Sequence, residues 1–243
     1  MDPTEPEYSA SGDEHFGSIG DGEAADSNVL TLRGYFIDIL AHTTSACEPM
    51  RRTSGDMENE YKAVVVWSIE ALSACLLFCP LNIGDFWTMI TAGCNVNPVI
   101  TTKTEAEPRV TVKAAYLFQQ YVMDYSDCHS ATHVEVLERL RGLKALSSED
   151  RALLIQFFFT LCEIICERRF SITKDGRIGL IPTRAKPNDL ICIIPGGKVP
   201  YLIRPLPQRG QDYYRFVGEA YIHGLMKGEG MKLGKAKETI RLV

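Results

Sequence analysis

The C-terminal third of the chain alternates apolar and polar residues with a period of two, and Gly and Pro corners separate its short runs. A period of two is typical of strands, because successive side chains point to opposite faces of a sheet. Residues 169–174 and 177–181 flank the pair Asp175-Gly176. This pair is typical of a two-residue type I′ turn, because Asp tolerates and Gly readily adopts a positive φ. The pattern therefore predicts a β-hairpin over residues 169–181.

Further strands are predicted on both sides of this hairpin. Residues 189–194 and 198–204 flank a Pro-Gly-Gly corner, which predicts a second antiparallel pair. Residues 213–223 form a fifth strand in the same pattern. Near the N-terminus, residues 29–40 are rich in β-branched and aromatic side chains. We expect them to form a strand that can complete the C-terminal sheet.

Upstream of residue 169 the apolar residues recur every three or four positions, which predicts helices. The last helix has the clearest start, because Ser147 is followed three residues later by Asp150 and then by a long apolar run. A Ser hydroxyl there accepts a hydrogen bond from a first-turn amide, and an acid is favourable near the positive helix end. Earlier helices are expected over residues 62–79, 84–92, 110–125 and 133–146.

Together these elements predict an α+β fold, in which a helical half packs on a small antiparallel β-sheet or partly closed barrel. The expected domain order has three parts. Residues 1–28 form a disordered acidic lead, residues 29–168 a strand plus helical region, and residues 169–243 a small β-unit with a C-terminal tail.

Charge is distributed unevenly along the chain. The first 27 residues contain eight acids and no Lys or Arg, which leaves 23 acids against 26 bases in the remainder. Such a lead has too few large apolar side chains to offset the entropy lost on ordering, so we expect it to be disordered. The remainder is close to neutral, and its basic C-terminal residues lack interleaved aromatics, so no nucleic-acid partner is expected.

One apolar segment, residues 63–81, is just long enough to span a bilayer. Glu70 near its centre and Pro80 near its end favour a buried core helix, so no membrane attachment is expected. The N-terminus lacks a basic stretch followed by an apolar one, the hallmark of a secretory signal. We therefore expect a cytoplasmic protein whose eight cysteines are reduced thiols.

Four cysteines form two pairs at helical spacing, Cys75 with Cys79 and Cys162 with Cys166. Two such faces can in principle hold zinc through four thiolates. Their neighbours are Leu, Phe and Ile, which favours buried thiols instead. A further candidate group, Cys128, His129 and His133, lacks a second ligand pair. No metal and no cofactor is expected.

Three residues of the β half are the strongest candidates for catalysis, although none is predicted to be catalytic. Glu219 and His223 share one face of the predicted strand 213–223, where a carboxylate can orient an imidazole. Cys192 lies between two isoleucines. Because no nucleophile, base and orienting group occur together, structural roles are favoured. The alternative is an enzyme that uses Glu219 and His223, or a cysteine, in a cleft between the two halves.

Several motifs resemble, in the same order, the region that follows the core domain of fungal heterokaryon incompatibility (HET) proteins. Leu30-Thr31-Leu32-Arg33-Gly34 with Asp38 is similar to a Leu-x-Leu-x-Gly-x-x-x-Asp motif of that family, and Phe86-Trp87 to the start of a Phe-Trp-x-Thr motif. The closest likeness lies in the β half. It comprises residues 169–182 around Asp175-Gly176, residues 188–197 around the Pro-Gly-Gly corner, 200–204, and 214–229.

The resemblance covers roughly residues 29–231 and implies the accessory half of such a protein, without the HET core that triggers cell death. Residues 1–28 are too few to encode that core. The expected function is therefore a non-catalytic interaction or regulatory module of a heterokaryon-incompatibility-like protein, related to fungal non-self recognition or cell death. A protein partner is expected.

Overall fold

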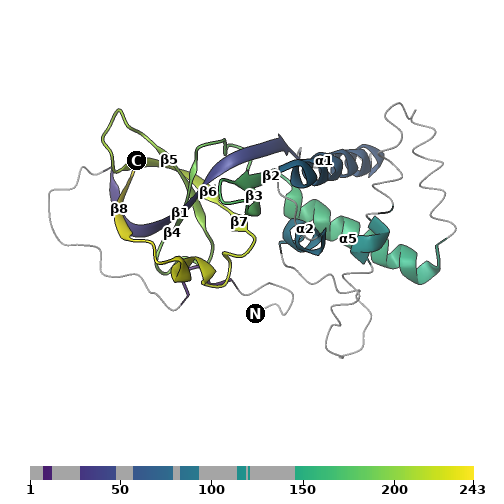
Figure 1. The fold of residues 1–243 in the computed structure, drawn as a ribbon. Coiled ribbons are helices and arrows are strands. Elements are labelled where there is room, and N and C mark those ends of the chain that lie inside the picture. The colour runs from purple at the N-terminus through teal and green to yellow at the C-terminus, as the bar shows by residue number, and fades with distance from the viewer. Residues whose placement is uncertain are drawn as a thin grey trace. The chain divides into compact units, whose positions relative to one another are not determined.

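The computed structural model of the chain describes residues 8–12, 28–47, 57–78, 83–92, 114–118, 120 and 146–243. They belong to two compact units (Figure 1). The described residues of the helical unit fall within Cys47–Ser73 and Asn82–Cys166. Those of the β unit fall within Glu7–Ala46, Ala74–Leu81 and Glu167–Val243.

The helical unit contains most of α1 (Met57–Phe78), together with α2 (Ile83–Ile90) and α5 (Ser148–Ile165). Its core is aromatic. Trp87 of α2 packs edge to face against Phe118 at 5.8 Å between ring centroids and against Phe157 of α5 at 6.3 Å. Such pairs contribute beyond the area that they bury. Residues 114–118 and 120 are helical, as expected, whereas the helix predicted over residues 133–146 lies almost entirely outside the described residues.

The predicted start of α5 is confirmed. The Ser147 hydroxyl accepts a hydrogen bond from the Asp150 amide at 3.0 Å, which satisfies one donor of the first turn. The helix stops at Ile165, and Glu167 adopts a left-handed conformation with φ 55° before the first strand of the β half. The change from helix to strand therefore falls within two residues of the position that the sequence pattern indicates.

The β unit is dominated by a closed barrel of five strands. They are β1 (Leu30–Ala46), β4 (Leu190–Ile193), β5 (Tyr201–Pro205), β6 (Tyr213–Glu219) and β8 (Lys237–Leu242). Neighbours follow the order β4-β5-β6-β8-β1, and β1 pairs again with β4 to close the ring. All these pairings are antiparallel except that of β6 with β8. Closure leaves these strands without the free edges of an open sheet over their paired lengths.

The long strand β1 belongs to two sheets (Figure 1). Its residues 30–39 pair in the barrel, and from Leu40 onward it pairs with β2 (Arg168–Thr173). The sheet continues to β3 (Ile178–Pro182) and to the short β7 (Tyr221–Ile222). Irregularities in register between Leu40 and His42 mark the change of partner.

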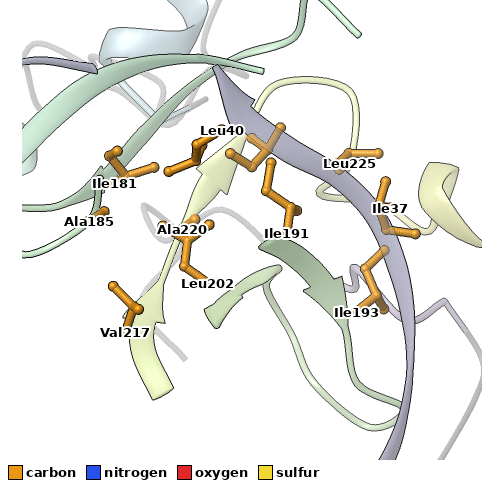
Figure 2. Packing of buried hydrophobic residues seen from close by; sticks show 11 residues of the cluster. Ile37, Leu40, Ile181, Ala185, Ile191, Ile193, Leu202, Val217, Ala220 and Leu225 are labelled. Carbon is orange, nitrogen blue, oxygen red and sulfur yellow. The ribbon is translucent and has the colours of Figure 1, made fainter. Parts of the chain in front are cut away.

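Two apolar layers stabilise the β unit, one on each face of the barrel wall. The inner cluster draws on all five barrel strands, and Phe36 of β1 contacts Tyr214 of β6 at 5.4 Å although these strands are not paired. The outer cluster packs β1, β4, β5 and β6 against the second sheet and the loops around it (Figure 2). Its members are Ile37, Leu40, Ile181, Ala185, Ile191, Ile193, Leu202, Val217, Ala220, Ile222 and Leu225.

The mixed α and β composition and both predicted strand pairs are confirmed, but three expectations about the β half were wrong. The barrel is closed and dominant, whereas a small sheet or partly closed barrel was expected. The hairpin over residues 169–181 lies in the second sheet, because the barrel takes its fifth strand, β8, from the supposed tail. The strand expected over residues 213–223 is interrupted at Ala220, after Gly218 with φ 151°.

Residues 8–12 also differ from the expected disordered lead. They form a turn against the β unit, where the Ala10 side chain is fully buried. The rest of the lead, except residue 28, lies outside the described residues. Within the described part of the chain, no helix combines the length and apolar character needed to cross a membrane.

Candidate binding site at the barrel mouth

An open apolar groove of about 740 Å³ lies in the β unit. Its volume falls in the range of ligand and peptide sites, which often occur at the mouths of barrels. Every barrel strand, or the residue that follows it, contributes to the lining. The lining residues are Asn28, Val29, Leu30, Leu32, Ile194, Tyr201, Phe216, Leu242 and Val243.

The groove is continuous with the inner core of the barrel, and we call it the barrel mouth. Leu32, Tyr201 and Leu242 line the groove and also pack against the inner cluster. At the rim, Leu30 and Phe216 remain 49% and 42% exposed. None of the lining residues carries a charged side chain, so the mouth presents apolar and aromatic surface to any partner.

The mouth lies beside the part of β6 that does not pair with β8. The parallel pairing joins Tyr213 to Arg241 and Tyr214 to Leu242, the last residue of β8. Past Tyr214, side chains from other segments bind the β6 backbone: Arg184 donates to the Val217 carbonyl, and Arg168 Nη1 donates to the Glu219 carbonyl at 2.9 Å. Phe216 lies on this stretch, and its ring is partly exposed.

Tyr201 supplies the phenolic hydroxyl of the mouth. Its ring packs against Phe216 at 5.9 Å between centroids. Burial raises the pKa of Tyr201, and the negative charge of Glu219 raises it further, so the hydroxyl stays protonated and able to donate at neutral pH. The Tyr201 ring packs closely against the Pro-Gly-Gly corner. A Cβ added to Gly197 would lie only 2.7 Å from Tyr201 Cε2.

A buried ion pair fixes the strands behind the mouth. Arg204 of β5 donates from Nε and Nη2 to the two carboxylate oxygens of Asp189, at 2.7 and 2.9 Å. The Asp189 side chain is 1% exposed and also accepts from the Lys186 amide. The hydrogen bonds to Asp189 raise the pKa of Arg204. Two-point geometry of this kind orients both groups and serves a structural role.

The candidate catalytic residues fall in different parts of the β unit. Glu219 is exposed at the end of β6, where it pairs with Tyr201, whereas His223 follows β7 in the second sheet, where its backbone amide donates to the Ile178 carbonyl. Their expected common strand is therefore broken between them.

The thiol of Cys192 lies inside the barrel. Its side chain is fully buried, and burial raises its pKa to about 12. A thiol in this environment stays neutral at physiological pH, whereas a nucleophilic cysteine requires the thiolate and access to solvent. Cys192 therefore acts as a small apolar residue of the barrel wall, on strand β4, which lies between β1 and β5.

The cysteine pairs considered for zinc are only partly described. Cys75 and Cys162 are buried and Cys166 is half-buried, whereas Cys79, Cys128, His129 and His133 lie outside the described residues. Among residues that the structure describes, no group of three or more His, Cys, Asp or Glu side chains is arranged to hold a metal ion.

Sequence reasoning missed the mouth itself. Phe216 and Leu30 appeared as ordinary strand residues, because the short pairing of β6 with β8 cannot be recognised when the residues of β8 are assigned to a tail. One signal was available: Ile240 and Leu242 alternate with polar residues after Gly234, as on a half-buried strand.

Comparison with known proteins agrees with the observed architecture. Residues 70–243 match the family model of the Het-6 beta-barrel domain. A curated relative, Heterokaryon incompatibility protein 6, OR allele, from Neurospora crassa, is 37% identical over 62 residues. That alignment covers 26% of this chain and 9% of the relative's length. No solved structure matches the chain.

Proposed function

The chain belongs to the fungal Het-6 beta-barrel family, and we propose that it is a non-catalytic interaction module whose barrel mouth binds a protein partner in heterokaryon incompatibility. The observation that carries this proposal is the mouth itself. A surface without charged side chains, with an aromatic anchor, exposed Leu and Phe at the rim and a single phenolic donor, has the composition of an interface centre.

The open form of the mouth favours a protein over a small metabolite. Leu30 and Phe216 project at the rim, about half exposed, where an extended segment or a helix face of a partner can cover both. The partner chemistry implied is an apolar segment with at least one aromatic or aliphatic anchor and a carbonyl to accept from Tyr201.

The proposal includes the absence of catalysis and a cytoplasmic location. In its support, the mouth lining contains no charged acid or base, and the most buried thiol near it is neutral. Cys192 is a reduced thiol buried in the barrel, which agrees with a reducing compartment. Recognition of non-self by this module follows as part of the same proposal, because the relative from Neurospora is a heterokaryon incompatibility protein.

The test compares mouth and control variants of the full chain in binding to fungal extract. Leu30→Glu and Phe216→Glu place a carboxylate in the mouth, and Leu233→Glu makes the same change at an equally exposed leucine on the 3-10 helix η2 (Glu229–Leu233). We expect both mouth variants to lose a partner that the wild type and Leu233→Glu retain. A partner set that is the same for all four chains would contradict binding at the mouth.

Catalysis is tested separately. The purified chain is incubated with fungal metabolite extract and the mixture is followed by mass spectrometry. We expect no turnover. Turnover that Glu219→Gln or His223→Ala abolishes would contradict the proposal and support the enzymatic alternative.

A further inference from the structure

A short N-terminal segment, Tyr8–Gly12, is docked on the barrel through its backbone, and we call it the strap. Three consecutive amides donate to carbonyls of the β unit, which resembles the way a peptide adds to an exposed backbone. The three bonds run from Ser9 to Met226 at 2.9 Å, from Ala10 to Lys198 at 2.9 Å and from Ser11 to Gly197 at 3.4 Å.

The strap fits its site only through small side chains. Ala10 is fully buried and Ser11 is 4% exposed. At its end, Gly12 approaches Gly228 so closely that a Cβ added to Gly228 would lie 3.1 Å from the Gly12 Cα. At its start, the Tyr8 ring packs edge to face on Tyr221 at 5.9 Å. A larger or charged group at position 10 or 11 therefore has no room in the docked arrangement.

The loop that receives the strap also shapes the barrel mouth. Gly197 and Lys198 lie in the connection between β4 and β5, which starts at Ile194 and ends at Tyr201. Both of those end residues line the mouth. The Gly197 amide donates to the Ile194 carbonyl at 2.9 Å, and the Tyr201 ring packs on Gly197. The strap thus holds a loop whose two ends form part of the mouth.

The sequence around Ser11 has the chemistry of a phosphorylation site. Asp13 and Glu14 stand two and three residues after it, and the whole lead of 27 residues contains eight acids and no Lys or Arg. Kinases choose substrates partly by complementary charge, so this context suits an enzyme with a basic substrate groove. Its hydroxyl is buried while the strap is docked, so a kinase can reach Ser11 only after release.

We propose that Ser11 is a phosphorylation site and that its modification keeps the strap released from the barrel. The Ser11 hydroxyl oxygen attacks the γ-phosphorus of ATP; the new O–P bond replaces the bond to ADP, which leaves, and the hydroxyl proton passes to the base of the kinase. The phosphate carries a charge of about −1.5 to −2 and cannot enter a site that excludes a solvated anion. Release then frees the loop that positions Ile194 and Tyr201.

Only the last step, an effect on partner binding at the mouth, rests on the proposed function. Release of the strap from the barrel does not rest on the proposed function, so it is measured without any partner. Amide hydrogen exchange of the full chain reports it directly, because the amides of Ser9, Ala10 and Ser11 are the donors of the docking bonds. We expect phosphorylation by an acid-directed serine kinase, located at Ser11 by mass spectrometry, to speed their exchange roughly tenfold or more.

Two variants complete the test. Ala10→Arg undocks the strap without adding phosphate, so the same kinase should modify Ser11 faster in that chain than in the wild type. Ser18→Asp adds an acid to the lead outside the strap and should leave the exchange of residues 9–11 unchanged. The proposal fails if phosphorylated chain keeps the wild-type exchange of these amides, or if Ser11 stays unmodified in both the wild type and Ala10→Arg. A released strap with unchanged partner binding would contradict only the coupling to the mouth.

Discussion

Arg177 donates from Nη1 to a carboxylate oxygen of Asp38 at 2.8 Å, across 139 positions of sequence. The other oxygen of Asp38 accepts from the amides of Ile39 and Asp175, at 2.7 and 3.3 Å. One buried carboxylate on β1 therefore secures the turn of the β2–β3 hairpin. The Asp38 and Gly34 positions that sequence resemblance singled out are thus explained by structure, because each lies where β1 meets a segment from far along the chain.

Replacing Asp38 with Ala should destabilise the β unit by about 2–3 kcal/mol, because it removes the acceptor of two amides and leaves Arg177 with only the exposed carboxylate of Asp175 as its ion-pair partner. The measurement is hydrogen exchange of the slowest amides of the barrel and second sheet. Asp212→Ala is the matched control, since Asp212 also binds an arginine, Arg241, at 3.0 Å but is 53% exposed. It should cost less than about 1 kcal/mol. An equal loss of stability in Asp38→Ala and Asp212→Ala would show that burial of the Asp38 carboxylate does not determine the effect.

Breaking the pair behind the mouth should also destabilise the barrel. Asp189→Ala removes the acceptor of the Lys186 amide and leaves Arg204 with only the Arg184 carbonyl, and we expect a loss of about 3 kcal/mol. Arg204→Lys keeps the charge but loses the two-point geometry, so it should cost an intermediate amount. Urea unfolding followed by far-ultraviolet circular dichroism measures both. A lysine variant as stable as the wild type would show that charge alone suffices.

Gly34→Ala should destabilise the barrel by about 1–3 kcal/mol. A Cβ there would lie 2.8 Å from Ile240 Cδ1 on β8 and 2.9 Å from the Ile193 carbonyl oxygen on β4, so it would push apart strands on both sides of β1. Gly234→Ala is the comparison, because its Cβ meets open space and only its φ of 64° opposes the change. It should cost about 1 kcal/mol. Thermal unfolding of the two variants, run side by side, measures the difference.

Stability should fall above pH 9 in a way that depends on Cys192. The fold raises the pKa of this thiol from 9.0 to about 12, so between these values the unfolded chain loses a proton that the folded chain keeps. The free energy of unfolding is therefore unaffected by this thiol below pH 9 and falls by about 1.4 kcal/mol per pH unit as the pH rises from 9 toward 12. Urea midpoints at successive pH values should show a shallower decline for Cys192→Ala. Parallel declines in the two chains would mean that Cys192 ionises as easily in the fold as outside it.

The sequence predicted those elements whose cause is local. The hairpin around Asp175-Gly176, the Pro-Gly-Gly corner and the Ser147 cap are each set by a few neighbouring residues, and the structure has all three. The predicted type I′ turn was wrong, because it requires a positive φ at both central residues and only Gly176 has one, at 80°. The closed barrel was not predictable in the same way, since closure depends on β1 pairing with both β4 and β8. Neither pairing has a short connecting turn, and residues 237–242 are mostly polar because one face of β8 is exposed.

The candidate site was missed for a related reason. Polar residues attracted attention, yet Glu219 ends β6, His223 follows β7, and Cys192 is fully buried inside the barrel. The mouth consists mostly of apolar residues that look like core positions in the sequence. Phe216 is distinguished from its buried neighbours only in the structure, where it lies beyond the two residues of β6 that pair with β8.

The pairing of Leu30 with Leu242 has a consequence for biosynthesis. As the polypeptide leaves the ribosome, β1 emerges early, but one of its two flanking barrel strands is translated more than two hundred codons later. During this interval the backbone N–H and C=O groups of β1 are unpaired and its apolar side chains are exposed, which makes the strand prone to aggregation. The barrel can therefore close only after β8 has left the ribosome, and production of the protein in a cell should depend on chaperones that shield β1 until then.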